Sequence, residues 1–388
     1  MKKIIGLCLS LIVLLCIFQT KTEYAEKEFQ LTYRNVTSAV LVEHKTGRVL
    51  FAHNADKRVP IASVTKIMTL ILGFEAVDNE LLTYDKLLTV STYASSMGGS
   101  EVFLNAGEEI SVEDVFKAII VASANDACVV LAEAIAGSVP QFVTMMNAKA
   151  KELGMQNTCF VNCTGLPAEG HYSTAEDVSL MSLELLKHPD YFNWSTIWTD
   201  HMSNLKNNTM ITNTNKLIRF YDGCDGLKTG FTNEAKYCIS ATASRGGERF
   251  IAVVLGMENS DDRFSLAKEL LNYGFANYKT VAVVKKGDSF EGSQDLIVKR
   301  GTKDTVTGVA GEDVSELIDS SSKPQYTVTS IPNTVITAPV REGDVIGQFV
   351  IYRGEEEIAR IDMLAASDVE KLGLGDYLRA IFGRWVWV

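Results

Sequence analysis

The stretch PIASVTKIMTLILGFEAVD, residues 60–78, predicts an apolar helix with a reactive pair of side chains at its start. Ser63 and Lys66 are three residues apart, so a helix places them on the same face. Residues 67–74 carry no charge, and a lysine at the mouth of such a helix is partly desolvated. Desolvation lowers the pKa of a lysine, and a neutral amine beside a serine hydroxyl is a candidate base. The alternative is a lysine that extends from a core helix to the solvent.

Strands are predicted on both sides of this helix along the chain. Before it, two alternating segments surround Lys45-Thr46-Gly47 and predict a β-hairpin, in which glycine serves the turn. After it, three segments joined by short polar turns predict an antiparallel meander, and a closing helix follows. The five strands therefore suggest one sheet with helices packed on it. The predicted strands are Ser38–His44, Arg48–His53, Gly226–Thr232, Lys236–Ser244 and Arg249–Gly256, and the closing helix is Ser260–Asn277.

A second motif, Ser123-Ala124-Asn125, interrupts a helical pattern that starts at Ser111, where Asp114 completes a capping box, and ends at Ala136. Serine and asparagine compete for backbone hydrogen bonds, so the break has a structural explanation. The functional interpretation places Ser123 beside Ser63 as a proton relay and uses the Asn125 amide to hold a substrate carbonyl.

A third motif, Lys228-Thr229-Gly230, lies on the first strand of the late meander. A missing side chain at Gly230 lets a substrate backbone run along the strand edge, while Lys228 and Thr229 offer a charge and a hydroxyl to a carboxylate. The structural alternative is an ordinary edge strand protected by its lysine.

Composition limits the possible functions of the chain. Its 388 residues exceed one typical domain, so two are expected. A formal net charge of −11 argues against general binding of nucleic acid, which needs a basic surface. Residues 1–25 begin with Met1-Lys2-Lys3 and an apolar run that is short for a membrane span, which predicts a signal peptide. Because Glu23 stands where a small residue is preferred, the cleavage site is poorly defined and an uncleaved anchor remains an alternative.

Seven cysteines occur in the sequence, two of them within the predicted signal peptide. The other five, Cys128, Cys159, Cys163, Cys224 and Cys238, are odd in number and cannot all pair within the chain. We expect buried free thiols, with a single Cys159–Cys163 bridge as the alternative. No cysteine or histidine pair has metal-ligand spacing, so neither a metal nor another cofactor is expected.

From about Thr280 the composition becomes rich in Val, Thr and Gly and predicts a small all-β domain. The last piece, 367–388, is predicted to be an amphipathic helix suited to a membrane interface, with packing on protein as the alternative. Its apolar stripe consists of Leu374, Tyr377, Leu378, Ile381, Phe382, Trp385 and Val388. The predicted organisation is thus a signal peptide at 1–25, a catalytic domain at 26–278, a β-rich domain at 279–366 and an anchor helix at 367–388.

The three motifs, in this order, resemble those of the low-molecular-mass penicillin-binding proteins, the serine-type D-alanyl-D-alanine carboxypeptidases of the penicillin-binding-protein-5 type. The resemblance covers nearly the whole chain, including the β domain and the tail. Its most specific stretches are Pro60–Lys66, Ser123–Cys128, Gly165–Ala175 and Asp225–Thr232. It implies an α/β (α+β) fold of the β-lactamase/transpeptidase type, in which helices flank an antiparallel sheet.

The resemblance also implies a mechanism. Ser63 would be the nucleophile, Lys66 its base, and Ser123 a proton donor to the leaving D-alanine. The N–H groups of Ser63 and Phe231 would form the oxyanion hole. Residues that would bind substrate are Asn125, Lys228, Thr229, Gly230, Phe231 and Thr232. Arg263 falls where the family often has arginine, whereas Asn213-Thr214-Asn215 lacks an arginine that some relatives carry there.

The implied partners are peptidoglycan stem peptides ending in D-Ala-D-Ala, β-lactam antibiotics and the membrane surface, at the outer face of the cytoplasmic membrane. One alternative is a class A β-lactamase, for which Glu169 is the tempting deacylating carboxylate. However, Glu169 lacks the asparagine that would follow it in such an enzyme. Another alternative is a non-catalytic cell-wall binding protein, which the complete Ser63/Lys66 pair disfavours.

Overall fold

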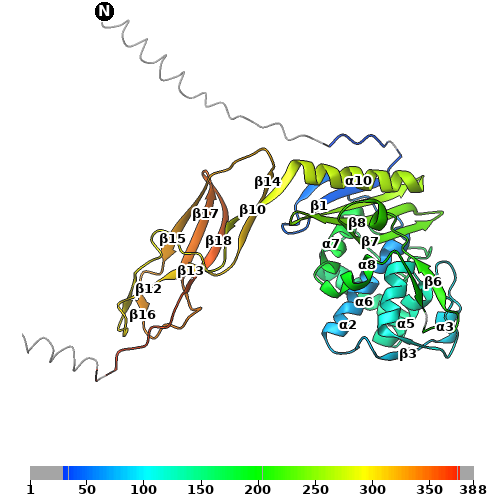
Figure 1. Cartoon of the computed structure of the whole chain (residues 1–388), viewed down its shortest axis with the longest axis horizontal. Coiled ribbons are helices and arrows are strands. Elements are labelled where there is room, and N and C mark those ends of the chain that lie inside the picture. Colours follow the sequence, from blue (N-terminus) through cyan, green and yellow to red (C-terminus); the bar gives the residue numbers. More distant parts are fainter. Residues whose placement is uncertain (1–28, 34, 203, 374, 376–388) are drawn as a thin grey trace, which may run out of the picture. The chain divides into compact units, whose positions relative to one another are not determined.

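The computed structural model describes residues 29–33, 35–202, 204–373 and 375 (Figure 1). The predicted signal peptide and the whole apolar stripe predicted for the tail lie outside these residues.

A five-stranded antiparallel sheet forms the centre of the part of the chain that carries the three motifs. Its strand order is β2-β1-β9-β8-β7, so the strand with Lys228-Thr229-Gly230 lies at one edge. Segments from the two ends of this region meet where β1 pairs with β9. The predicted single sheet is therefore confirmed. The strands are β1 (Ser38–Glu43), β2 (Val49–His53), β7 (Cys224–Thr232), β8 (Lys236–Arg245) and β9 (Glu248–Met257).

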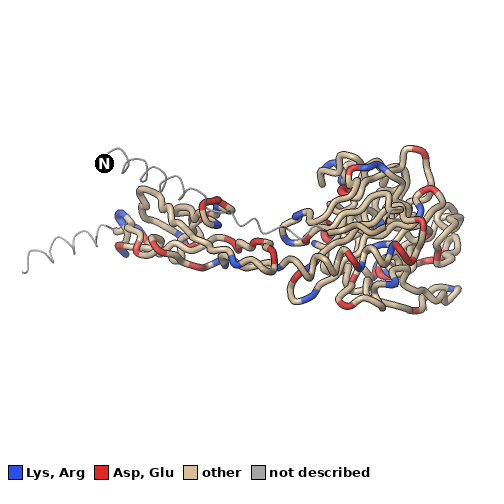
Figure 2. The backbone as a smooth tube through the Cα atoms, turned by 90° about the horizontal axis from the view of Figure 1, so that it is seen from above, with Lys and Arg blue, Asp and Glu red and all other residues tan. Residues whose placement is uncertain are grey.

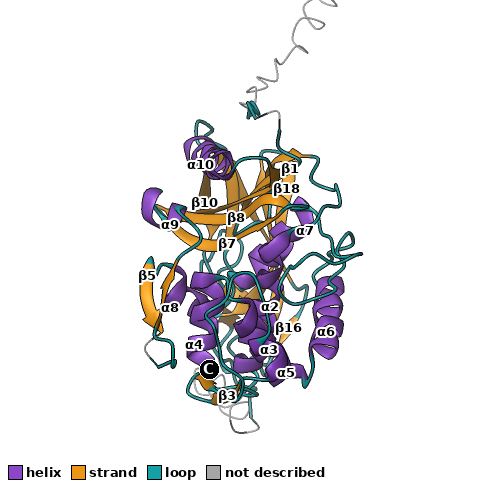
Figure 3. Ribbon diagram, turned by 90° about the vertical axis from the view of Figure 1, so that its right-hand side faces the viewer, coloured by secondary structure: helices purple, strands orange, loops and turns teal. Residues whose placement is uncertain are grey.

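Helices cover both faces of this sheet. Figure 3 shows α10 on one side and the helical body, including α2 and α7, on the other. The predicted flanking of the sheet by helices is confirmed, and the closing helix has the predicted bounds. The longer helices are α2 (Lys66–Asp78), α4 (Val112–Lys117), α5 (Asn125–Ala136), α6 (Val139–Glu152), α7 (Ala175–Leu185) and α10 (Ser260–Asn277).

The helix predicted over residues 60–78 begins later than expected. A 3-10 turn, η1 (Ala62–Thr65), holds Ser63, and the α-helix starts at Lys66. Ala62 has a φ of 46°, a left-handed conformation that is uncommon for a residue with a side chain. Residues 66–74 are all buried, because the helix passes through the core rather than along its surface.

The predicted break between α4 and α5 is confirmed. Ser111 Oγ caps α4 by accepting the Asp114 N–H. The helix then widens into a π-turn, η2 (Ala118–Ala122), and stops at Ser123, whose φ is 61°. The left-handed backbone at Ser123, rather than a competing local side-chain hydrogen bond, ends the helical run.

Several short elements were not predicted from the sequence. They form two small hairpins and single helical turns around the helical body. These elements are β3 (Leu87–Thr89), α3 (Thr92–Ser95), β4 (Glu109–Ser111), η3 (Pro189–Tyr191), α8 (Phe192–Ser195), β5 (Thr199–Met202), β6 (Thr209–Thr212) and α9 (Leu217–Phe220).

The predicted all-β region is confirmed and has an apolar core of its own, which includes Phe349 and Met363. Its largest sheet has the order β13-β18-β17-β15. The tail prediction is wrong at its start, because 367–373 is not helical: Val369 bridges to Val340 and Lys371 to Gly301. The strands are β10 (Tyr278–Val284), β11 (Leu296–Lys299), β12 (Thr305–Val306), β13 (Gly308–Ala310), β14 (Val314–Asp319), β15 (Tyr326–Pro332), β16 (Ile336–Thr337), β17 (Val345–Arg353) and β18 (Glu356–Ala365).

The distribution of charged residues and the state of the cysteines can be compared with what the composition predicts. In Figure 2 the basic positions are scattered among acidic ones along the described backbone. The five cysteines outside the predicted signal peptide are free, so the Cys159–Cys163 bridge is wrong. Four of them are buried as predicted, whereas Cys159 is partly exposed. Within the described residues no single helix is long and apolar enough to cross a membrane; α5 and α6 pass that test only together, as a pair bent by 83°.

The first Lys-Thr-Gly, at Lys45-Thr46-Gly47, is the turn of the β1–β2 hairpin, and the buried Glu43 carboxylate holds it. That carboxylate accepts the N–H groups of Lys45 and Thr46, each at 2.8 Å, and the Thr46 hydroxyl at 2.6 Å. Gly47 supplies the positive φ, 68°, that the turn requires. This copy of the motif therefore has a complete structural explanation.

We predict that Glu43→Ala lowers the free energy of unfolding by roughly 1–3 kcal/mol, because the turn loses the charged acceptor of three hydrogen bonds. Chemical denaturation would measure this. Lys45→Ala is the matched control, since the Lys45 side chain is exposed, and its effect should stay within about 0.5 kcal/mol. Equal effects of the two substitutions would show that the carboxylate does not hold the turn.

Candidate active site

Ser63 and Lys66 meet at the junction of η1 and α2. The Lys66 Nζ lies 2.8 Å from Ser63 Oγ and 2.7 Å from the carbonyl oxygen of Thr164. The Lys66 side chain is fully buried, so the alternative of a lysine that reaches the solvent is wrong. Burial lowers its pKa, which favours the neutral amine that proton abstraction requires.

The loop that supplies the Thr164 carbonyl presses closely on the Ser63 turn. A Cβ at Gly165 would lie 1.9 Å from the Ala62 carbonyl oxygen, and Gly165 has a φ of 83°. Only glycine fits both conditions. The contact of Thr164 with Lys66 was not predicted, because it joins residues 98 apart through a backbone atom, which no side-chain pattern records.

Ser123 reaches the same cavity as Ser63 because of its left-handed backbone. It is 3% exposed and lines the cavity together with Ser63 and Thr229. Asn125, two residues further on, donates from Nδ2 to the Gly98 carbonyl at 2.6 Å. Its Oδ1 is buried without a hydrogen-bond partner among the described residues, so it remains an available acceptor.

The segment beside Asn125 is held by a residue that the sequence reasoning missed. The Asp126 carboxylate accepts the N–H groups of Val102 and Leu104, each at 3.1 Å. The same segment supplies the carbonyl of Ser100 to the Asn125 N–H at 2.7 Å. Burial raises the pKa of Asp126, and these backbone donors oppose that rise. An aspartate next to the Ser-Ala-Asn motif was the only sequence signal of this role.

Lys228 and Thr229 lie on β7, and Thr229 lines the cavity. Lys228 is 2% exposed, and its Nζ donates to the Thr229 carbonyl at 3.1 Å. Burial first, and then repulsion from Lys66, lower its pKa well below the usual value. The Thr229 hydroxyl donates to Thr214 Oγ1 at 2.7 Å. Thr214 belongs to the stretch 213–215 that lacks the arginine of some relatives, and it lines the cavity there.

Gly230 is required by a contact inside the protein, whereas the sequence predicted that it makes room for a substrate backbone. A Cβ at this position would lie 2.8 Å from the Ser63 nitrogen and 2.9 Å from the Ile61 carbonyl oxygen. The missing side chain therefore lets β7 approach the turn that carries Ser63. Phe231, half exposed, stacks on Tyr237 with ring centroids 4.4 Å apart and lines the same cavity as Ser63.

Four predicted site residues do not line the Ser63 cavity: Lys66, Asn125, Lys228 and Thr232. The first three are buried beside it, and Thr232 has a different role. Its hydroxyl accepts the Ala235 N–H at 3.0 Å, which closes the turn after β7. It lines a second cavity, described below, on the other side of the Ser63 turn.

Arg263 reaches the Ser63 cavity from α10 and supports β7 from behind. Its Nη1 donates to the carbonyls of Gly230 at 3.2 Å and Cys238 at 3.1 Å. The guanidinium also lies over the rings of Phe264 and Tyr237. Burial lowers its pKa to about 10, so it remains a cation at neutral pH.

The Ser63 cavity has a volume of about 250 Å³. Its lining is Ser63, Ser100, Ser123, Thr214, Thr229, Gly230, Phe231, Tyr237 and Arg263. Hydroxyl groups and the Arg263 guanidinium supply the polar part of this surface, which suits an acyl substrate with a carboxylate. Glu169, the candidate deacylating group of a class A β-lactamase, is not part of the lining. The described residues contain no cluster of His, Cys, Asp and Glu that could hold a metal ion.

Comparison with known proteins agrees with this geometry. Residues 25–259 match the family described as D-alanyl-D-alanine carboxypeptidase, and residues 278–371 match the penicillin-binding protein 5 C-terminal domain. The chain is 39% identical to the D-alanyl-D-alanine carboxypeptidase DacF of Bacillus subtilis, over 90% of this chain and 89% of that protein.

Two solved structures show the same similarity. Penicillin binding protein 5 from Haemophilus influenzae superposes with a TM-score of 0.74 at 28% identity, covering 88% of this chain and all of that one. Penicillin-binding protein D2 from Listeria monocytogenes, in its ampicillin-bound form, has a TM-score of 0.55 at 36% identity, covering 63% of this chain and all of that one. The chain therefore belongs to the D-alanyl-D-alanine carboxypeptidase family and is a serine-type carboxypeptidase of the penicillin-binding-protein-5 type.

Proposed function

We propose that this protein removes the terminal D-alanine from peptidoglycan stem pentapeptides through an acyl-enzyme on Ser63. The observation that carries the proposal is the buried Lys66 amine, 2.8 Å from Ser63 Oγ, whose pKa is lowered by desolvation. A neutral amine at this distance can take the hydroxyl proton as the oxygen attacks.

In the acylation step, Ser63 Oγ attacks the carbonyl carbon between the two D-alanines, and its proton passes to Lys66. The N–H groups of Ser63 and Phe231 stabilise the negative oxygen that develops. The C–N bond then breaks, and the leaving amine receives a proton through Ser123. The shared cavity of Ser63 and Ser123 supports this relay.

Water then hydrolyses the ester, which releases the shortened peptide and restores the Ser63 hydroxyl. We assign the activation of this water to Lys66, because it is the base next to the ester oxygen. Glu169 lies on the lining of a different cavity and has no part in this assignment.

The substrate carboxylate is assigned to the end of the cavity that Thr229 lines, with Asn125 holding an amide of the substrate. The Arg263 guanidinium supplies positive charge there, and the buried Lys228 amine offers a further N–H donor. The stretch 213–215 lacks the arginine of some relatives, and the hydroxyl pair Thr214–Thr229 lines the cavity there. β-Lactams present the same acyl and carboxylate groups and are assigned to the same site.

We further propose the following domain boundaries and cellular location for the protein. These are a signal peptide at 1–25, a catalytic domain at 26–278, a β-rich domain from 279 that includes the bridges at Val369 and Lys371, and an amphipathic segment at 374–388. Export would place the catalytic domain outside the cytoplasm, and the apolar stripe of the tail would attach it to the outer face of the cytoplasmic membrane.

The nucleophile assignment predicts the behaviour of Ser63→Ala. This variant should form no covalent adduct with penicillin and release no D-alanine from a D-Ala-D-Ala peptide, because no other group can form the ester. Mass spectrometry of the intact protein measures the adduct. Ser203→Ala, at another Ser-x-x-Lys of the sequence, is the control and should acylate normally. A stable adduct on Ser63→Ala would refute the assignment.

The base assignment predicts that Lys66→Arg lowers the acylation rate by roughly 10²–10⁴-fold, since a guanidinium does not give up its proton near neutrality. In the parent protein, acylation should slow as the pH falls through the lowered pKa of Lys66, because the protonated amine cannot accept the Ser63 proton. Stopped-flow acylation with a chromogenic β-lactam tests both. Near-normal acylation by Lys66→Arg would show that Lys66 acts only through its charge and not as a base.

The anchor assignment predicts that mature protein truncated after residue 371 stays folded and cleaves soluble peptide but no longer sediments with anionic liposomes. Several apolar side chains, at roughly 1.5–3 kcal/mol each when buried, are enough for peripheral attachment. Sedimentation of both forms with anionic and neutral liposomes would measure it. Equal sedimentation of full-length and truncated protein contradicts the anchor.

A further inference from the structure

A second cavity, which we call the acyl-side cavity, adjoins the Ser63 site. Its volume is about 350 Å³, at the lower end of the roughly 300–1,000 Å³ of small-molecule sites. Ala62 and Thr232 line it, and these are chain neighbours of Ser63 and Phe231 in the catalytic cavity. The two cavities therefore follow one another along the outer end of β7. The complete lining is Pro60, Ala62, Gly165, Leu166, Pro167, Ala168, Glu169, His171, Thr232 and Glu234.

The geometry of an extended substrate leads to this cavity. β7 is an edge strand, so a peptide can lie along it. The substrate carboxylate is assigned to Thr229, and Thr232 follows three residues later. Three residues correspond to about 10 Å of strand. A substrate in extended conformation covers a similar length from its terminal carboxylate to the residue that precedes D-Ala-D-Ala. The side chain of that preceding residue thus comes opposite Thr232 and Glu234.

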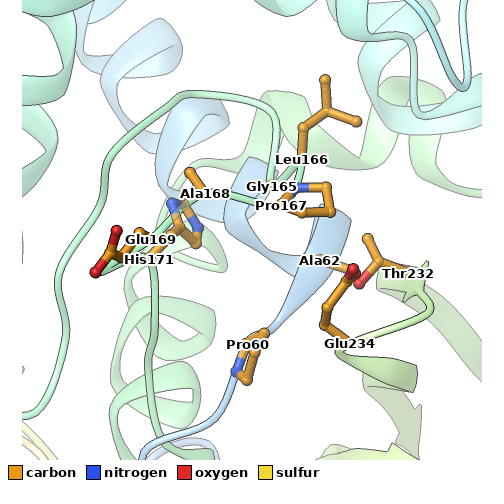
Figure 4. Close-up of a pocket in the computed structure, with 10 residues that line it drawn as sticks. All are labelled: Pro60, Ala62, Gly165, Leu166, Pro167, Ala168, Glu169, His171, Thr232 and Glu234. Atoms are coloured by element: carbon orange, nitrogen blue, oxygen red, sulfur yellow. The ribbon is translucent and has the colours of Figure 1, made fainter.

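The walls of the acyl-side cavity have two kinds of surface. Figure 4 shows Thr232 and Glu234 on one side, the 165–171 loop on the other and Pro60 below. Pro60, Ala62, Leu166 and Pro167 provide apolar surface for a methylene chain. The Glu234 carboxylate lies near Ala62 and Thr232, whereas the Glu169 side chain points away from them (Figure 4).

The charge of the cavity is negative at neutral pH. His171 accepts the Val161 N–H at Nδ1, so its proton is on Nε2, which lies 2.8 Å from Thr65 Oγ1. Burial lowers its pKa to about 4, and the ring is neutral. Glu234 forms no ion pair among the described residues, whereas the nearby Lys236 pairs with Glu258 at 3.5 Å. Glu234 is therefore left to attract a cation from solution.

We propose that the acyl-side cavity binds the side chain of the residue preceding D-Ala-D-Ala, and that Glu234 favours one ending in a free ammonium group. This inference rests on the proposed function. Apolar walls with a carboxylate at one end suit a lysine-like chain, which packs its methylenes and keeps its charge solvated. The site would thus favour stems whose amine is free over stems whose amine is acylated.

The test compares two peptides, Nα-acetyl-L-Lys-D-Ala-D-Ala and Nα,Nε-diacetyl-L-Lys-D-Ala-D-Ala, as substrates for full-length protein. The ratio of their kcat/KM values, free amine over acylated, is the readout. Glu234→Gln should lower this ratio about 2- to 5-fold, as expected for an exposed ion pair. Glu234→Lys should lower it further, because attraction becomes repulsion. Increasing salt should reduce the ratio in the parent protein and not in Glu234→Gln.

Glu258→Gln is the matched control, since it removes one exposed carboxylate that Lys236 already pairs. Its ratio should equal that of the parent, and turnover of the diacetyl peptide reports that each variant is folded. A ratio unchanged in both Glu234 variants, or lowered equally by Glu258→Gln, overturns the inference while leaving the proposed function intact. Cleavage of neither peptide by the parent protein overturns the proposed function and this inference with it.

Discussion

Burial of the Lys66 amine is the constraint on which the rest of the site depends. A buried ammonium is costly unless it is paired, and Lys66 forms no ion pair among the described residues. Desolvation lowers the pKa of Lys66 and so favours its neutral form. Burial also lowers the pKa of Lys228, whereas Arg263 remains a cation at neutral pH and lines the Ser63 cavity. The site therefore combines an unprotonated base beside Ser63 with a cation that attracts an anionic substrate end.

Close backbone contacts hold this arrangement in place. The Ser63 turn is pressed between the loop at Gly165 and strand β7 at Gly230, and neither position has room for a Cβ. Arg263 then fixes β7 through the Gly230 carbonyl. The nucleophile is therefore set by three segments far apart in the sequence rather than by its own helix. This placement keeps Ser63 on a rigid support while leaving its hydroxyl accessible.

The sequence predicted the elements well where the signal was periodic and local. The five-stranded sheet, the break at Ser123 and the Ser63/Lys66 pair follow from alternation, residue type and helical spacing. Contacts made by backbone atoms or between distant segments were not predictable. The Thr164 carbonyl on Lys66 and the Thr214–Thr229 pair belong to this class. Gly230 was predicted to be required, but for a substrate rather than for the Ser63 turn.

The two Lys-Thr-Gly copies show why context decides the meaning of a motif. At Lys45 the three residues form a solvent-facing turn, and the buried Glu43 carboxylate satisfies its N–H groups. At Lys228 the same residues lie in a strand, with the lysine buried and no ion pair among the described residues. The same three residue types thus form a hydrogen-bonded turn in one place and a site that can accept an anion in the other. The difference is that only the second copy has a buried lysine with no ion pair among the described residues. A substrate carboxylate can supply that missing partner.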